Sequence, residues 1–147
     1  MWCRLSTISL ELVDKLKVQP PERLRRAAAD AASFAVQQLC LADPRLDAAL
    51  AALRGGKFGD TGERSAAQQL TRELDMIAWE VKKTAEERNS SMQPYYAAFA
   101  RARAAASVKC ALDSNPLNAA LEAVYEAQAA VADLQAIRTV VETALTT

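Results

Sequence analysis

Apolar residues recur every three or four positions along most of the chain, the spacing of helices that bury one face. The stretch from Thr61 to Arg88 shows it best, with a continuous apolar seam made of Ala67, Leu70, Leu74, Ile77, Val81 and Ala85. No run alternates apolar and polar residues as a half-buried strand does, and no Asn-Gly turn joins two such runs. The pattern therefore predicts an all-α protein.

All five prolines and all four glycines fall between the periodic segments. They divide the chain into about six helices, near residues 8–17, 22–41, 45–53, 61–88, 94–112 and 116–145. Asp43-Pro44 and Asn115-Pro116 each place a capping side chain before a proline at the first helical position. Short connections favour antiparallel neighbours, so we expect one bundle over residues 1–147. Residues 1–19 either belong to this bundle or form a loosely attached N-terminal helix.

Alanine is the commonest residue, with 32 of the 147 positions. Between residues 94 and 112 it places small side chains around the whole circumference of the predicted helix. Small side chains let neighbouring backbones approach closely. We therefore expect this alanine-rich helix to be the centre of the bundle.

Charge and cysteine content narrow the class of protein. Lys+Arg and Asp+Glu both number 18, whereas binding to nucleic acid or to an anionic membrane is driven by excess positive charge. Neither partner is expected. The three cysteines are far apart and form no CxxC pair, which is typical of reduced thiols. No window approaches the roughly 18 apolar residues of a membrane span, and no signal peptide is visible. We expect a cytoplasmic protein.

The chain contains no histidine, the commonest catalytic base and metal ligand. No catalytic motif, cofactor motif or metal-ligand spacing takes its place, so enzymatic activity is uncertain and less expected than binding. Residues 54–62 hold every glycine, but Phe58 follows Lys57 where a phosphate-binding loop needs Ser or Thr. We interpret this loop as a helix connector. Glu122 and Glu126, one turn apart, are expected on a solvated helix face.

Candidate contact residues are large or basic side chains among the alanines. Trp79 falls opposite the apolar seam of its predicted helix, beside Met76 and near Arg72. Either a second layer of helices covers it, or it lies on the surface as an interface residue. The remaining candidates are Tyr96 and the basic cluster Arg23, Arg25 and Arg26.

Two segments resemble a known family. Residues 43–50 (DPRLDAAL) with Gly55-Gly56 downstream, and residues 116–120 (PLNAA) with Tyr125 and Ala127, are similar to the Imm-5-like immunity proteins over roughly residues 22–132. The resemblance implies a helical protein that neutralises a co-encoded bacterial toxin by binding it. It implies no catalysis and carries over no site residues.

The sequence thus predicts a non-catalytic protein that binds another protein, such as a toxin. Two alternatives remain open. One is a small all-α enzyme or ligand carrier with a pocket of Arg, Glu and Tyr side chains between helices. The other is a structural protein that binds itself as a homo-oligomer. A converging pocket would favour the first alternative, whereas an apolar surface around Trp79 would favour protein binding.

Overall fold

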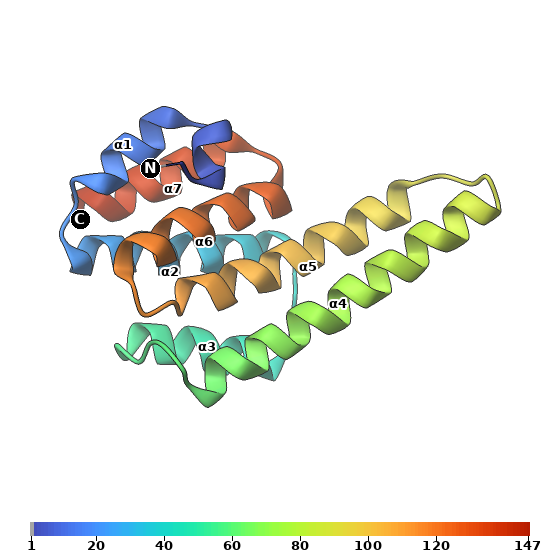
Figure 1. Ribbon diagram of the computed structural model, residues 1–147, viewed down its shortest axis with the longest axis horizontal. Helices are drawn as coiled ribbons and strands as arrows, with labels where there is room; N and C mark the ends of the chain where they lie inside the picture. Colours follow the sequence, from blue (N-terminus) through green and yellow to red (C-terminus); the bar gives the residue numbers. More distant parts are fainter. Residues whose placement is uncertain (1) are drawn as a thin grey trace.

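The computed structural model describes residues 2–147, and every regular element in that range is a helix (Figure 1). A 3₁₀ turn, η1 (Arg4–Thr7), precedes seven α-helices: α1 (Leu10–Lys17), α2 (Pro21–Gln38), α3 (Pro44–Arg54), α4 (Gly62–Glu87), α5 (Gln93–Ala111), α6 (Pro116–Val131) and α7 (Leu134–Thr146). The predicted all-α fold is confirmed. None of these helices is long and apolar enough to cross a membrane.

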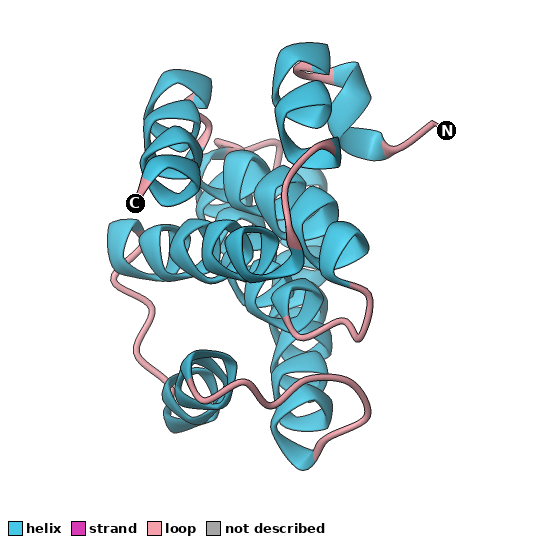
Figure 2. Ribbon diagram, turned by 90° about the vertical axis from the view of Figure 1, so that its left-hand side faces the viewer, coloured by secondary structure: helices cyan, strands magenta, loops and turns pink. Residues whose placement is uncertain are grey.

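The helices pack in layers around α2, α6 and the C-terminal half of α5 (Figure 1). α1 and α7 cover one side of this centre, and α3 and the start of α4 cover the other. Viewed from the end opposite the far tips of α4 and α5, the helices are joined by short loops (Figure 2). Together they form one compact bundle.

The helix ends follow the capping signals of the sequence closely. Asp43 accepts a hydrogen bond from the backbone N–H of Arg45 at 2.8 Å, and Asn115 accepts one from that of Asn118 at 3.0 Å. The expected final helix over residues 116–145 is instead two helices. Ala132 adopts a left-handed conformation (φ 57°) that ends α6, and the Asp133 side chain then caps α7.

α5 is the central helix over only half of its length. Ala104 and Ala105 are fully buried, and α5 packs against α2, α4 and α6. Ala97, nearer the start of α5, is exposed. The prediction of a central alanine-rich helix is therefore right for the C-terminal half and wrong for the N-terminal half, which extends beyond the body with α4 (Figure 1).

The predicted apolar seam of α4 also changes along its length. Ala67 and Leu70 are buried at the body end, as expected, but Ile77 is exposed and Ala78 is buried in its place. Beyond Leu74, α4 packs only against α5, so only the narrow strip of α4 that faces α5 is buried. A three-and-four spacing of apolar residues does not show where along a helix its neighbours end.

The N-terminal segment is an integral part of the core. Leu5, Leu12 and Leu16 are all less than 2% exposed. η1 and α1 both contact α6. Leu5, Leu12, Val13 and Leu16 therefore complete the hydrophobic core on that side.

Candidate functional site

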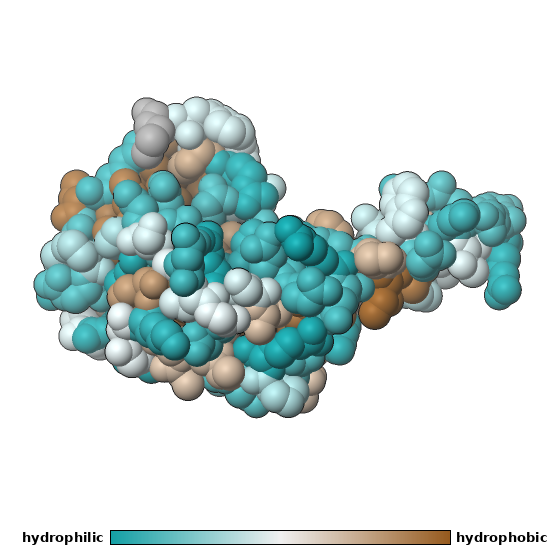
Figure 3. Space-filling view, turned by 60° about the horizontal axis from the view of Figure 1, so that its bottom comes forward, coloured by the Kyte–Doolittle hydropathy of each residue, from teal (hydrophilic) through white to brown (hydrophobic). Residues whose placement is uncertain are grey.

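A helical hairpin projects from the body of the protein. α4 is 26 residues long and α5 is 19, whereas the main core cluster reaches only to Leu74 on α4 and Ala104 on α5. The end of α4, the turn after it and the start of α5 stand clear of the body (Figure 1, Figure 3). We call residues 76–100 the arm. Its two helices pack together through small residues such as Ala78 and Ala85, which are buried between them.

The arm exposes large apolar side chains that a monomer would ordinarily bury. Trp79 is 62% exposed and Met76 is 70% exposed, and Ile77 and Tyr96 are more than half exposed. Apolar atoms are visible on the surface where the arm leaves the body (Figure 3). The sequence left open whether a second layer of helices covers Trp79 or whether it lies on the surface. In the single chain, Trp79 lies on the surface.

One side of the arm is lined by aromatic rings and one cation. The Lys82 ammonium lies 6.0 Å from the ring centre of Trp79 and 5.6 Å from that of Tyr95, within cation–π range. Tyr95 in turn contacts Phe99 and Tyr96, with ring centres 6.0 and 5.7 Å apart. These five residues connect α4 to α5 and form a continuous aromatic face.

The basic cluster of the sequence is not part of this surface. Arg23 donates a hydrogen bond to the carbonyl oxygen of Leu145, and Arg25 donates one to that of Asp113. Arg26 reaches the C-terminal residue beside α7. These three arginines lie in the first two turns of α2. Arg23 and Arg25 donate to carbonyl oxygens at the C-terminal ends of α7 and α5, where positive charge is favourable. Both therefore act as intramolecular caps, whereas Arg26 contacts the hydroxyl of Thr147.

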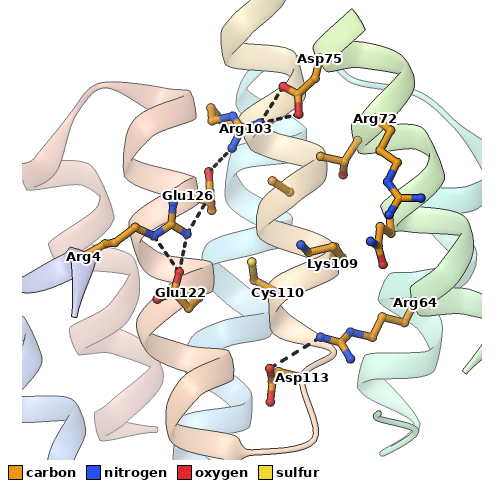
Figure 4. Close-up of a pocket in the computed structure, with 13 residues that line it drawn as sticks. Arg4, Arg64, Arg72, Asp75, Arg103, Lys109, Cys110, Asp113, Glu122 and Glu126 are labelled. Atoms are coloured by element: carbon orange, nitrogen blue, oxygen red, sulfur yellow. Dashed lines mark hydrogen bonds and ion pairs between the residues drawn. The ribbon is translucent and has the colours of Figure 1, made fainter. Parts of the chain in front are cut away.

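A pocket of about 410 Å³ lies at the base of the arm, between η1, α4, α5 and α6 (Figure 4). Its wall is mostly charged, and Arg72, one of the contact candidates, is part of it. The other lining residues are Arg4, Arg64, Gln68, Thr71, Asp75, Arg103, Ala106, Lys109, Cys110, Asp113, Glu122 and Glu126. The structure thus brings Arg and Glu side chains together as the ligand-carrier alternative requires, although no tyrosine lines the pocket.

An ion-pair network fills the side of the pocket next to α6 (Figure 4). Glu126 accepts hydrogen bonds from Arg4 at 2.9 Å and from Arg103 at 3.0 Å. Arg4 also holds Glu122, and Arg103 holds Asp75 at 2.7 Å. The expectation of a solvated Glu122–Glu126 face is therefore wrong for Glu126, whose side chain is 4% exposed. A carboxylate can be buried there because two arginines from other elements compensate its charge.

The opposite side of the pocket carries cations with little compensation. Arg64 and Arg72 extend from α4 and Lys109 extends from α5 toward the same space (Figure 4). Two carboxylates lie near the guanidinium of Arg64, that of Asp113 at 3.6 Å and that of the exposed Asp60 at 3.8 Å. Arg72 and Lys109 form no ion pair with any residue from 2 to 147.

Cys110 places a thiol in this pocket. Burial raises the pKa of the thiol to about 11, so it remains protonated near neutral pH. A protonated thiol is a poor nucleophile and a poor metal ligand. Among residues 2–147, no three acidic, thiol or imidazole side chains are grouped closely enough to hold a metal ion. The thiol of Cys110 is therefore poorly reactive near neutral pH.

The glycine-rich loop forms a connector between α3 and α4. Gly56 and Gly59 adopt positive φ values of 78° and 88°, conformations that glycine accepts without strain. The Gly59 N–H donates to the carbonyl oxygen of Leu112 at 2.8 Å, which ties the loop to the end of α5. Lys57 pairs with Glu63 at 2.9 Å, so its charge is already compensated within the loop region.

Sequence reasoning found the residues of the arm but missed most of those of the pocket. Met76, Trp79 and Tyr96 lie on the arm, and Arg72 lies at its base. Lys109 and Arg103 were not singled out, because the pocket draws on elements more than 100 residues apart. The one usable signal was the presence of three basic residues, Arg101, Arg103 and Lys109, on an alanine-rich helix.

No protein-family model matches this chain, and neither does any curated protein or any solved structure.

Proposed function

We propose that this protein acts by binding another protein through the arm, without catalysis. The observation that carries the proposal is the exposure of Trp79 and Met76 on a hairpin that stands clear of the body. Aromatic residues and methionine are enriched in the cores of protein interfaces, and tryptophan is the commonest hot-spot residue. A contiguous exposed apolar surface on a monomer is characteristic of an interaction site.

The construction of the arm supports this role. Its two helices are joined by small buried residues, which leaves the large side chains on the outside. Lys82 lies between Trp79 and Tyr95, and the three side chains together restrict one another's movement. Binding to pre-positioned side chains costs less conformational entropy than binding to mobile ones. The arm therefore has both the composition and the order of a binding surface.

The sequence resemblance to Imm-5-like immunity proteins suggests the kind of partner. On that basis the partner is a co-encoded bacterial toxin, which the arm would engage by an apolar surface. The chain would act in the cytoplasm, since its three cysteines all stand as free thiols. The role in immunity rests on the sequence resemblance, and the role of the arm rests on its exposed side chains.

A matched pair of tryptophan variants tests the proposal. Trp79→Ala removes the central ring of the arm, whereas Trp2→Ala removes a ring that is 74% exposed on the body. Tagged wild type and both variants are incubated with a lysate of the organism that encodes them, and captured proteins are identified by mass spectrometry. We expect one partner to bind wild type and Trp2→Ala and to be lost with Trp79→Ala. A hot-spot truncation weakens binding by at least about 30-fold.

Light scattering on purified protein distinguishes binding to another protein from self-association. A monomer over the full concentration range, together with loss of the captured partner in Trp79→Ala, supports the proposal. A dimer that Trp79→Ala dissociates would instead assign the arm to self-association. A partner retained at full affinity by folded Trp79→Ala would exclude the arm as the binding surface.

A further inference from the structure

The charges of the pocket are unevenly distributed between its two sides. On the α6 side, the carboxylates of Asp75, Glu122 and Glu126 are each engaged by Arg4 or Arg103. On the α4 side, Arg64 has the carboxylates of Asp113 and exposed Asp60 within 3.8 Å, whereas Arg72 and Lys109 form no ion pair within residues 2–147. The lining as a whole holds five cations and four carboxylates, so the pocket has a net positive charge. Its unpaired cations, Arg72 and Lys109, both lie on the α4 side.

Unfilled hydrogen-bonding capacity lies beside this charge. The Nε atoms of Arg64 and Arg103 are buried and have no hydrogen-bond partner within residues 2–147. Leaving a buried donor without an acceptor is destabilising. Arg72 and Lys109 add donors that no carboxylate in the described chain takes up. An oxyanion with several acceptor atoms supplies what these lining residues lack.

We propose that the α4 side of the pocket binds a small oxyanion, held by Arg72 and Lys109 with Arg64 beside them. The ligand class comprises phosphate and its monoesters together with small dicarboxylates, since both present several charged oxygens. Two or more charged oxygens let one ion engage both unpaired cations, Arg72 and Lys109. A cavity of about 410 Å³ is within the usual range of small-molecule sites. This binding is separate from protein binding by the arm, and either can hold without the other.

The pocket is partly open, because Arg72 is exposed, whereas Arg64 and Lys109 are half-buried. It lies between four elements, so a bound anion contacts α4 and α5 at once (Figure 4). The side chains of Arg64 and Arg103 are 29% and 18% exposed, which places them in a region where charge is screened less than on an open surface. The protonated Cys110 thiol adds no negative charge that would repel the ligand.

Titration calorimetry of the purified chain tests the proposal, with inorganic phosphate as one ligand and succinate as the other. Both titrations run at constant ionic strength set with sodium chloride. We expect saturable one-to-one binding of at least one of the two anions. Tighter binding of phosphate would identify phosphate or its monoesters as the ligand class, and tighter binding of succinate would identify dicarboxylates.

Three single substitutions locate the site. Lys109→Gln and Arg72→Gln each remove one pocket cation that makes no internal ion pair, so both variants should fold. Lys83→Gln is the matched control, because Lys83 is an exposed lysine on the same helix as Arg72 but does not line the pocket. We expect at least about tenfold weaker binding for each pocket variant and less than about twofold for the control, since each pocket variant loses a charge-assisted hydrogen bond to the anion.

Three results would overturn the proposal. The first is the absence of saturable binding for both phosphate and succinate at millimolar concentration. The second is unchanged affinity in folded Lys109→Gln and Arg72→Gln. The third is an equal loss in Lys83→Gln, which would show that net charge, and not the pocket, attracts the anion. Circular dichroism of each variant confirms that the helices are intact.

Discussion

Replacing Glu126 by glutamine removes the central charge of the pocket network while keeping the shape of the side chain. The Glu126 carboxylate is 4% exposed and accepts hydrogen bonds from Arg4 and Arg103. Glutamine can still accept through its single carbonyl oxygen, but its NH₂ group then faces a guanidinium that also only donates. One of the two arginines therefore loses the acceptor that Glu126 provides in this buried position.

The size of the loss follows from what each arginine keeps. Breaking a fully buried ion pair costs about 3–5 kcal/mol, because an uncompensated charge is left inside. Here Arg4 keeps Glu122 and Arg103 keeps Asp75, so neither guanidinium is left without a carboxylate. We therefore expect the free energy of unfolding to fall by about 2–3 kcal/mol, below the full cost of an isolated pair.

Urea unfolding followed by circular dichroism at 222 nm measures this change, with Glu122→Gln as the matched control. Glu122 lies one turn away on α6 and bonds only to Arg4, and its side chain is 35% exposed. An exposed pair of this kind contributes about 0.2–1 kcal/mol. Thermal melts should agree, with Glu126→Gln lowering the melting temperature by about 5–10 °C, at 2–4 °C for each kcal/mol in a chain of this size.

Two results would refute this reasoning. One is a loss of less than about 0.5 kcal/mol in Glu126→Gln, the scatter of ordinary surface substitutions. The other is an equal loss in the two variants, which would show that burial of the carboxylate does not set its contribution. A changed denaturant slope would instead report an altered unfolded or native state, so the comparison requires equal slopes.

Two further predictions concern packing and thiol reactivity. Ala105→Leu should lower the free energy of unfolding by about 1–3 kcal/mol, because Ala105 is fully buried in the bundle. Ala97→Leu, on the exposed part of the same helix, should change it by less than about 0.5 kcal/mol. Equal effects of the two substitutions in urea unfolding would contradict the position at which the core ends on α5. With a disulfide reagent at pH 8, exposed Cys40 should react readily in the folded protein, whereas Cys110 should react slowly because its pKa is about 11. The reaction rate of Cys110 should rise about tenfold per pH unit up to pH 10, since the thiolate fraction rises by that factor. A Cys110 rate that levels off near pH 9 would show that burial does not raise its pKa.

The sequence was informative wherever a local signal decided the structure. The capping residues Asp43 and Asn115 begin helices where their side chains predict them, because the hydrogen bonds involved span only a few residues. The all-α class was predictable for the same reason. The break at Ala132 was not, since alanine carries no preference for the left-handed conformation that it adopts there.

The candidate site was predictable only in part. Trp79 stood out because it falls opposite the apolar seam, but the spacing was equally consistent with a second layer of helices. Ile77 belonged to the predicted seam and is exposed, because the body ends before it. The burial of Glu126 had no local signal at all. Its two arginines lie 122 and 23 residues away along the chain.

The sequence by itself determined the helices of this protein, their capping and the residue types available for chemistry. Those properties depend on neighbours within one or two helical turns, so composition and spacing record them. Only the tertiary structure decided which faces are covered. It placed Trp79 on a projecting arm, buried Glu126 between two arginines, and brought Arg72 and Lys109 to one pocket without a carboxylate partner. Burial and charge compensation depend on which distant segments pack together, and the spacing within one helix carries no record of that.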